Sequence, residues 1–205
     1  IVGTLEERWF YSEILGREMP YWAYLPPDYK LSGRRYPVIY MLHGRGGHRD
    51  EWIHYTLVDV ADREMSHGVL PPMIIIMPQG DRGFWVNNVG DGPRWGDYVV
   101  QELVPEVDNT YRTLRSPASR AIGGLSMGGF GALTLAFTNP DVFGVVGAHT
   151  PSLRAEDEDI RFLGTGDEYA QRDPLFLAKT APGVERLRIW IDIDEADPWL
   201  DRVKE

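Results

Sequence analysis

One short segment has the residue types and the spacing for nucleophilic chemistry. Gly124, Ser126 and Gly128 form the pattern Gly-x-Ser-x-Gly, in which a serine stands on a sharp turn between a strand and a helix. Such a turn strains the serine backbone and crowds the positions two residues away, so both must be glycine. The serine hydroxyl then lies beside N–H groups of the next helix, which can stabilise negative charge. The pattern therefore predicts Ser126 as a nucleophile, and the alternative is a tight turn with a surface serine.

A second glycine-rich loop could supply more N–H groups to the same site. Residues 36–42 form a nearly continuous apolar run, which predicts a strand buried on both faces of a sheet. The run leads into His43-Gly44-Arg45-Gly46-Gly47-His48, where glycines allow the backbone to approach a ligand. We interpret this loop as half of an oxyanion hole, with an ordinary strand-exit turn as the alternative.

Alternating strands and helices must position these two loops. Apolar runs and periodicity predict antiparallel strands at 5–12 and 21–25 and further strands at 36–42, 73–77, 121–122, 142–148 and 187–193. They predict helices at 57–66 and 97–111, and a helix after the serine turn that includes 132–137 and ends at Asn139-Pro140. Pro105 lies inside the helix at 97–111 and should bend it or loosen one turn. The alternation predicts a single α/β domain over residues 1–205, built as a three-layer sandwich.

Composition excludes several classes of function. The net charge of −10 disfavours nucleic acid and anionic membranes as partners. The chain has no cysteine, which excludes disulfides, thiolate catalysis and cysteine metal sites, and no stretch has the length of a membrane span. No signal peptide is visible, so a cytoplasmic location is favoured, and secretion stays open because the first residue is Ile1 rather than methionine.

Neither the histidines nor the acidic residues predict a metal site. None of the five histidines pairs at helical ligand spacing with a carboxylate partner. The acidic run at 156–159 lacks the alternating ligands and the glycine of a calcium loop, so we interpret it as a solvated surface. We expect no metal and no cofactor.

Five motifs together resemble a known family. They are Tyr-Leu-Pro-Pro-Asp-Tyr (24–29), Leu-His-Gly-Arg-Gly-Gly (42–47), Gly-Leu-Ser-Met-Gly-Gly (124–129), Asn-Pro-Asp-Val-Phe (139–143) and Asp-Ile-Asp-Glu-Ala-Asp-Pro-Trp (192–199). The chain resembles, over nearly its whole length, the esterase D-like family of α/β-hydrolases, which includes feruloyl and acetylxylan esterases, S-formylglutathione hydrolases, enterobactin esterases and mycolyltransferases. The resemblance implies the α/β-hydrolase fold with a mostly parallel central sheet.

The resemblance also implies roles for particular residues. Ser126 is the expected nucleophile, and the backbone N–H groups of Arg45 and Met127 are the expected oxyanion hole. Asp197 follows the last predicted strand, where the triad acid of this fold stands. The alternative for Asp197 is a surface residue that caps the next helix, with Pro198 at its first position.

The triad histidine is missing from its usual place. In this fold it follows the acid, yet all five histidines precede Asp197. We therefore expect a C-terminally truncated chain that lacks a helix, a strand and a histidine-bearing loop of about 40–60 residues. His149, at the end of a predicted strand, is interpreted as a substrate-pocket residue with Trp85 and His48, and a substitute base is the alternative for it.

These residues indicate a serine carboxylic-ester hydrolase that forms an acyl-enzyme on Ser126. An acyltransferase of the same fold and an esterase-derived binding protein are the alternatives. The expected substrate is a small-molecule or carbohydrate-linked ester. The apolar strand at 187–193 would have an open edge, which predicts a homodimer or strand exchange there.

Overall fold

A seven-stranded sheet forms the centre of the computed structural model, which describes residues 1–156 and 158–205. The strands, in spatial order, are β1 (Thr4–Ser12), β2 (Arg17–Leu25), β4 (Ile74–Pro78), β3 (Val38–Leu42), β5 (Arg120–Leu125), β6 (Val145–His149) and β7 (Arg188–Asp192). β1 and β2 run antiparallel to their neighbours, and β3 to β7 run parallel to one another. The mostly parallel sheet is as predicted.

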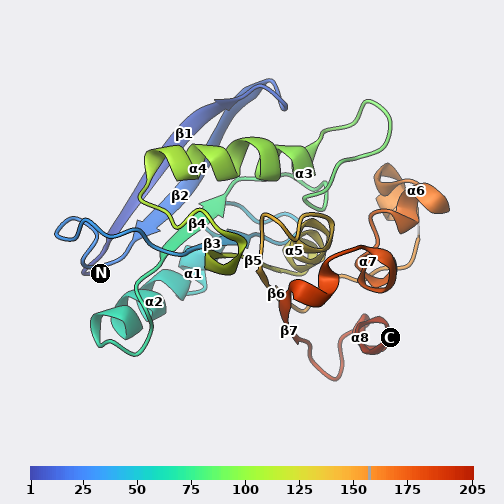
Figure 1. Cartoon of the computed structure of the whole chain (residues 1–205). Coiled ribbons are helices and arrows are strands. Elements are labelled where there is room, and N and C mark those ends of the chain that lie inside the picture. Colours follow the sequence, from blue (N-terminus) through green and yellow to red (C-terminus); the bar gives the residue numbers. More distant parts are fainter. Residues whose placement is uncertain (157) are drawn as a thin grey trace.

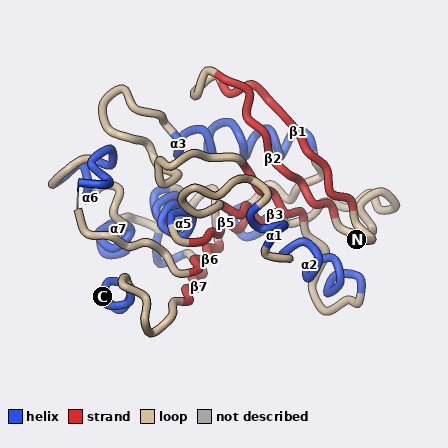
Figure 2. Tube along the Cα trace, turned by 180° about the vertical axis from the view of Figure 1, so that it is seen from behind, coloured by secondary structure: helices blue, strands red, loops and turns tan. Residues whose placement is uncertain are grey.

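Helices cover both faces of this sheet (Figures 1 and 2). They are α1 (Glu51–His54), α2 (Leu57–Ser66), α3 (Trp95–Asp97), α4 (Val104–Thr110), α5 (Met127–Thr138), α6 (Asp167–Ala170), α7 (Pro174–Thr180) and α8 (Leu200–Lys204). α1 and α2 share one apolar cluster with the sheet, whereas α4, α5 and α7 share the other. The two clusters make the three layers of an α/β sandwich, with the apolar central strands β3 and β4 buried between them.

The helix predicted at 97–111 forms with an irregular centre. Its regular parts are α3 and α4, and residues Tyr98–Leu103 between them form a π-helical segment. Pro105 follows at the second position of α4, where its missing N–H cannot bond to the carbonyl of Gln101. The loosened turn expected from Pro105 is confirmed, and it lies on the N-terminal side of the proline.

The two edge strands of the sheet are β1 and β7. β1 lies at one edge as part of a long hairpin with β2, and β7 lies at the other edge, near α8 (Figures 1 and 2). All five residues of β7 are exposed, including the apolar Ile189, Trp190 and Ile191. Within the described residues, no helix has both the length and the apolar character needed to cross a membrane.

Candidate active site

Ser126 occupies a strained turn between β5 and α5. Its backbone has φ 55° and ψ −113°, which is a region that side chains other than glycine rarely adopt. A Cβ atom on Gly124 would lie 2.4 Å from the carbonyl of Gly128, and one on Gly128 would lie 2.3 Å from the carbonyl oxygen of Leu42. Because both clashes are with backbone atoms, only glycine fits at these positions. The structure thus has the nucleophile-elbow geometry that the sequence predicts.

The glycine loop after β3 lies directly against this elbow. β3 pairs with β5 so that Leu42 is opposite Gly124, and the first turn of α5 touches the backbone of Leu42 and His43. Met127 is the first residue of α5, so its N–H has no acceptor within the helix. The N–H of Arg45 likewise has no acceptor among the described residues. Among the residues that the structure describes, these two N–H groups thus have no acceptor at this end of the sheet.

Four hydrogen bonds hold the loop before Arg45 in place. The Trp52 indole N–H donates to the carbonyl of Leu42 (3.1 Å), and the Trp85 indole N–H donates to the carbonyl of His43 (3.1 Å). The Gly44 N–H donates to Glu51 Oε1 at 2.9 Å. The Gly80 N–H donates to His43 Nε2, also at 2.9 Å. The polar groups of this turn are thus paired with α1 and with the loop after β4.

His43 is neutral in this arrangement. Its side chain is buried with 1% exposure, and burial lowers the pKa of the imidazole below its ordinary value. Since Nε2 accepts a hydrogen bond from Gly80, the proton is on Nδ1, which lies 2.8 Å from the Gly44 carbonyl oxygen. His43 therefore supports the glycine loop.

The hydroxyl of Ser126 has a partner that the sequence did not indicate. Ser126 Oγ and Ser152 Oγ are 2.8 Å apart, and either of the two atoms can donate the hydrogen bond. The Ser152 N–H also donates to the carbonyl of Ser126 (3.1 Å), and Ser152 is buried. Ser152 therefore fixes both the backbone and the hydroxyl of the elbow.

His149 ends β6 beside the elbow. Its carbonyl accepts the N–H of Ser126 (2.9 Å), and its Nδ1 lies 3.2 Å from Asp192 Oδ2 at the end of β7. The imidazole packs between the rings of Trp52 and Trp190. In the described part of the chain, no hydrogen bond joins the His149 ring to Ser126 Oγ. The structure places His149 next to Ser126 without pairing the two side chains.

Asp197 lies in the loop between β7 and α8. Its Oδ1 accepts the N–H of Trp199 at 2.8 Å, and its carbonyl accepts the N–H of Leu200. These two bonds close a turn just before α8, whose N-cap is Trp199, so Asp197 does not cap the helix as the alternative interpretation had it. The side chain is half-buried, and the geometry pairs it with no histidine among the described residues.

Of three other expected site residues, Arg45 and His48 are exposed and Trp85 is buried. The side chains of Arg45 and His48 are exposed on the glycine loop. Trp85, expected in the substrate pocket, is instead 1% exposed and packs against His43 and Trp95. Phe84 and Trp85 both have positive φ angles, 56° and 61°, and this backbone turns the indole into the core. Trp85 thus supports the glycine loop and does not line an open pocket.

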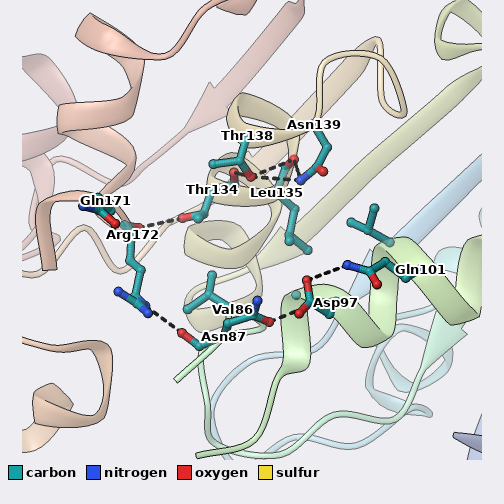
Figure 3. Close-up of a pocket in the computed structure, with 12 residues that line it drawn as sticks. Val86, Asn87, Asp97, Gln101, Thr134, Leu135, Thr138, Asn139, Gln171 and Arg172 are labelled. Atoms are coloured by element: carbon teal, nitrogen blue, oxygen red, sulfur yellow. Dashed lines mark hydrogen bonds between the residues drawn. The ribbon is translucent and has the colours of Figure 1, made fainter. Parts of the chain in front are cut away.

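A cavity of about 310 Å³, with both polar and apolar lining residues, lies away from Ser126, near the C-terminal half of α5 (Figure 3). Asn87, Asp97 and Arg172 form hydrogen bonds along its wall: Asn87 accepts from the Asp97 N–H and from Arg172 Nε. It belongs to the packing between α5 and the loops around it.

No metal-binding cluster of three or more histidine or acidic residues occurs among the residues that the structure describes. Asp157 of the acidic run lies outside them.

The fold and the strained serine define an α/β-hydrolase architecture, and comparison with known proteins gives the family. The sequence model of the family described as "Putative esterase" matches residues 12–204, so the chain belongs to this esterase family. The solved structure of a ferulic acid esterase superposes with a TM-score of 0.82 at 23% identity, covering 98% of this chain and 82% of that one. The solved structure of an S-formylglutathione hydrolase of Staphylococcus aureus superposes with a TM-score of 0.78 at 18% identity, covering 98% of this chain and 84% of that one.

Two curated relatives are larger proteins. An esterase of Mycobacterium tuberculosis strain H37Rv is 37% identical over 138 residues, which are 64% of this chain and 29% of the relative. An endo-1,4-beta-xylanase/feruloyl esterase of Xylanibacter ruminicola is 27% identical over 181 residues, which are 81% of this chain and 25% of the relative. The chain thus spans less than a third of the length of these two proteins.

Proposed function

We propose that this chain is a serine carboxylic-ester hydrolase that works through an acyl-enzyme on Ser126. The observation that carries the proposal is the strained elbow: Ser126 stands at φ 55° between two glycines that no other residue can replace. A residue kept at a cost of about 1–3 kcal/mol indicates that its position serves a function. Membership of the esterase family supports the same reaction.

In the first half of the reaction, Ser126 Oγ attacks the carbonyl carbon of the ester and gives its proton to a general base. The carbonyl oxygen becomes an oxyanion, which the N–H groups of Arg45 and Met127 stabilise. Loss of one such donor costs about 100- to 1000-fold in rate. The bond to the alcohol oxygen then breaks, and the alcohol leaves with the proton.

In the second half, water attacks the acyl group on Ser126 by the same route. The base takes the proton of the water, and the carboxylic acid leaves as the serine regains its proton. Among the described residues, no histidine side chain is hydrogen-bonded to Ser126 Oγ, so the proposal names no residue as the general base. Asp197, after β7, is proposed as the acid that orients it. His48 and His149 are proposed to lie along the substrate.

The proposed substrate class is a small-molecule or carbohydrate-linked ester. The Xylanibacter relative is named as both an endo-1,4-beta-xylanase and a feruloyl esterase, which supports a carbohydrate-linked ester for this chain as well. The acyl acceptor is water in the proposed reaction, and product analysis with an added alcohol would detect transfer.

The test combines covalent labelling with turnover. A fluorophosphonate should add once to the folded protein, and peptide mapping should place the adduct on Ser126. Hydrolysis of p-nitrophenyl acetate should fall to background in Ser126→Ala, which circular dichroism should show to be folded. Failure of the folded wild type to label and to hydrolyse, or equal hydrolysis by Ser126→Ala, would overturn the proposal.

A further inference from the structure

Two large aromatic side chains stand exposed on one face of the outer strand β1. Trp9 is 57% exposed and Tyr11 is 52% exposed. Residues two apart on a strand point to the same face and are separated by about 7 Å. Phe10 between them points to the other face, where it stacks on Tyr98. Trp9 and Tyr11 thus present two rings side by side to solvent, although aromatic residues usually contribute to cores.

Arg49 connects these rings to the loop of the candidate active site. Its guanidinium lies over the Trp9 ring, 5.7 Å from the ring centre, and its Nε donates to Glu7 Oε1 at 2.9 Å. Glu7 is on the same face of β1 as Trp9. Arg49 follows Arg45 by four residues, and a chain of that length spans at most about 14 Å. The aromatic pair therefore lies within a short distance of the oxyanion loop.

A polar cavity of about 320 Å³ adjoins the aromatic pair across β2. Pro20 and Glu18, which line the cavity, are the cross-strand partners of Trp9 and Tyr11. Gln79, on its opposite side, accepts the N–H of Arg49 at 3.2 Å. Exposed rings, a cavity and paired charges thus form one continuous surface beside the site.

We infer that this surface, made of Trp9, Tyr11, Arg49 and the cavity beside Glu18, binds the polysaccharide part of a carbohydrate-linked ester. The C–H faces of sugar rings stack on aromatic rings, and the sugar hydroxyls need polar groups at the rim, here Glu7, Glu18 and Arg49. Two exposed rings about 7 Å apart along one face of a strand fit an extended chain such as a β-linked polysaccharide. The net charge of −10 favours a neutral chain over a polyanionic one. The inference rests on the proposed function, because the bound chain would carry the ester that Ser126 hydrolyses. Binding of the polysaccharide itself does not require Ser126.

Native gel electrophoresis with soluble polysaccharide in the gel tests this binding. The wild-type protein should be retarded by wheat arabinoxylan or by barley β-glucan, relative to a gel that contains α-linked dextran. Trp9→Ala and Tyr11→Ala should each weaken the apparent affinity by about tenfold, the effect of losing one good stacking contact. Phe176→Ala is the matched control, because Phe176 is an exposed aromatic on α7, away from β1.

Ser126→Ala separates this inference from the proposed hydrolysis. This variant should bind the polysaccharide like the wild type, and Phe176→Ala, which lies outside both surfaces, should bind and hydrolyse p-nitrophenyl acetate like the wild type. Retardation without hydrolysis would overturn the proposed function and leave the binding surface in place. Absence of retardation in both β-linked polysaccharides, or equal retardation of the wild type, Trp9→Ala and Tyr11→Ala, would overturn the binding surface.

Discussion

Ser126 Oγ and Ser152 Oγ are hydrogen-bonded at 2.8 Å, so the candidate nucleophile is held by a residue that follows β6. The two residues are also joined by the bond from the Ser152 N–H to the Ser126 carbonyl. The bond between the hydroxyls is made of side-chain atoms alone, so substitution can remove it and leave the backbone bond intact.

A double-mutant cycle measures this bond. Ser126→Ala and Ser152→Ala should each lower the free energy of unfolding by about 1 kcal/mol, the net value of a hydrogen bond. The double variant should lose little more than either single one, because each substitution removes the same contact. Urea unfolding followed by fluorescence gives the three differences. Simple additivity of the two losses would show that the bond contributes nothing.

Gly128→Ala should destabilise the protein strongly. The new Cβ would lie 2.3 Å from the carbonyl oxygen of Leu42, which the pairing of β3 with β5 holds in place. We expect a loss of about 3 kcal/mol or more, measured by urea unfolding. Gly147→Ala on β6 is the control, because its Cβ would approach only the Trp190 ring, at 3.9 Å. Similar losses for the two variants would contradict this account of the elbow.

Glu51 should influence the reaction through the oxyanion loop. Glu51→Ala leaves the buried Gly44 N–H without an acceptor, which costs about 1–3 kcal/mol in stability. Displacement of the loop should lower the rate of ester hydrolysis by up to about 100-fold, with little change in KM. Glu51→Gln keeps an oxygen acceptor and should retain most of the rate. Equal rates for Glu51→Ala and the wild type would contradict the role.

Stability should fall on the acid side because of His43. Burial lowers the pKa of His43 below the ordinary 6.5. Between the folded pKa and 6.5, the imidazole is therefore protonated in the unfolded chain and neutral in the folded chain. The contribution of neutral His43 is complete above pH 6.5 and is lost as the pH falls from 6.5 towards the folded pKa. The thermal midpoint should therefore drop between pH 7 and pH 5.5. The drop should be smaller than in the wild type in a folded His43→Gln variant. In His67→Asn it should equal that of the wild type, because the side chain of His67 is exposed.

β7 should promote self-association. In an antiparallel pair of two copies centred on Trp190, Arg188 lies opposite Asp192 and Ile189 lies opposite Ile191. The unpaired N–H and C=O groups of an exposed edge strand can bond to a strand of another chain, and a lysine on the edge strand opposes this pairing. Sedimentation should detect a dimer that Ile191→Lys weakens. A wild type that sediments only as the 23.3 kDa monomer would contradict the expectation.

Local patterns in the sequence predicted the strands, the elbow and the glycine loop, because each depends on residues close together in the chain. Contacts between distant segments were not predicted. Ser152 reaches Ser126 only because Thr150, with φ 46°, turns the chain back after β6. Trp85 was placed in a pocket since an aromatic in a loop has no periodicity that says which way it points. Its positive φ angle decides this, and it is visible only in the structure.

The turn at residues 42–44 is tied to α1 through Trp52 and Glu51, and to the loop after β4 through Gly80 and Trp85. Neither tether is part of the sheet, so each can open while the strands stay paired. Catalytic competence would then disappear during partial opening, before the molecule unfolds as a whole. Turnover in mild denaturant would be a more sensitive indicator of local order than circular dichroism.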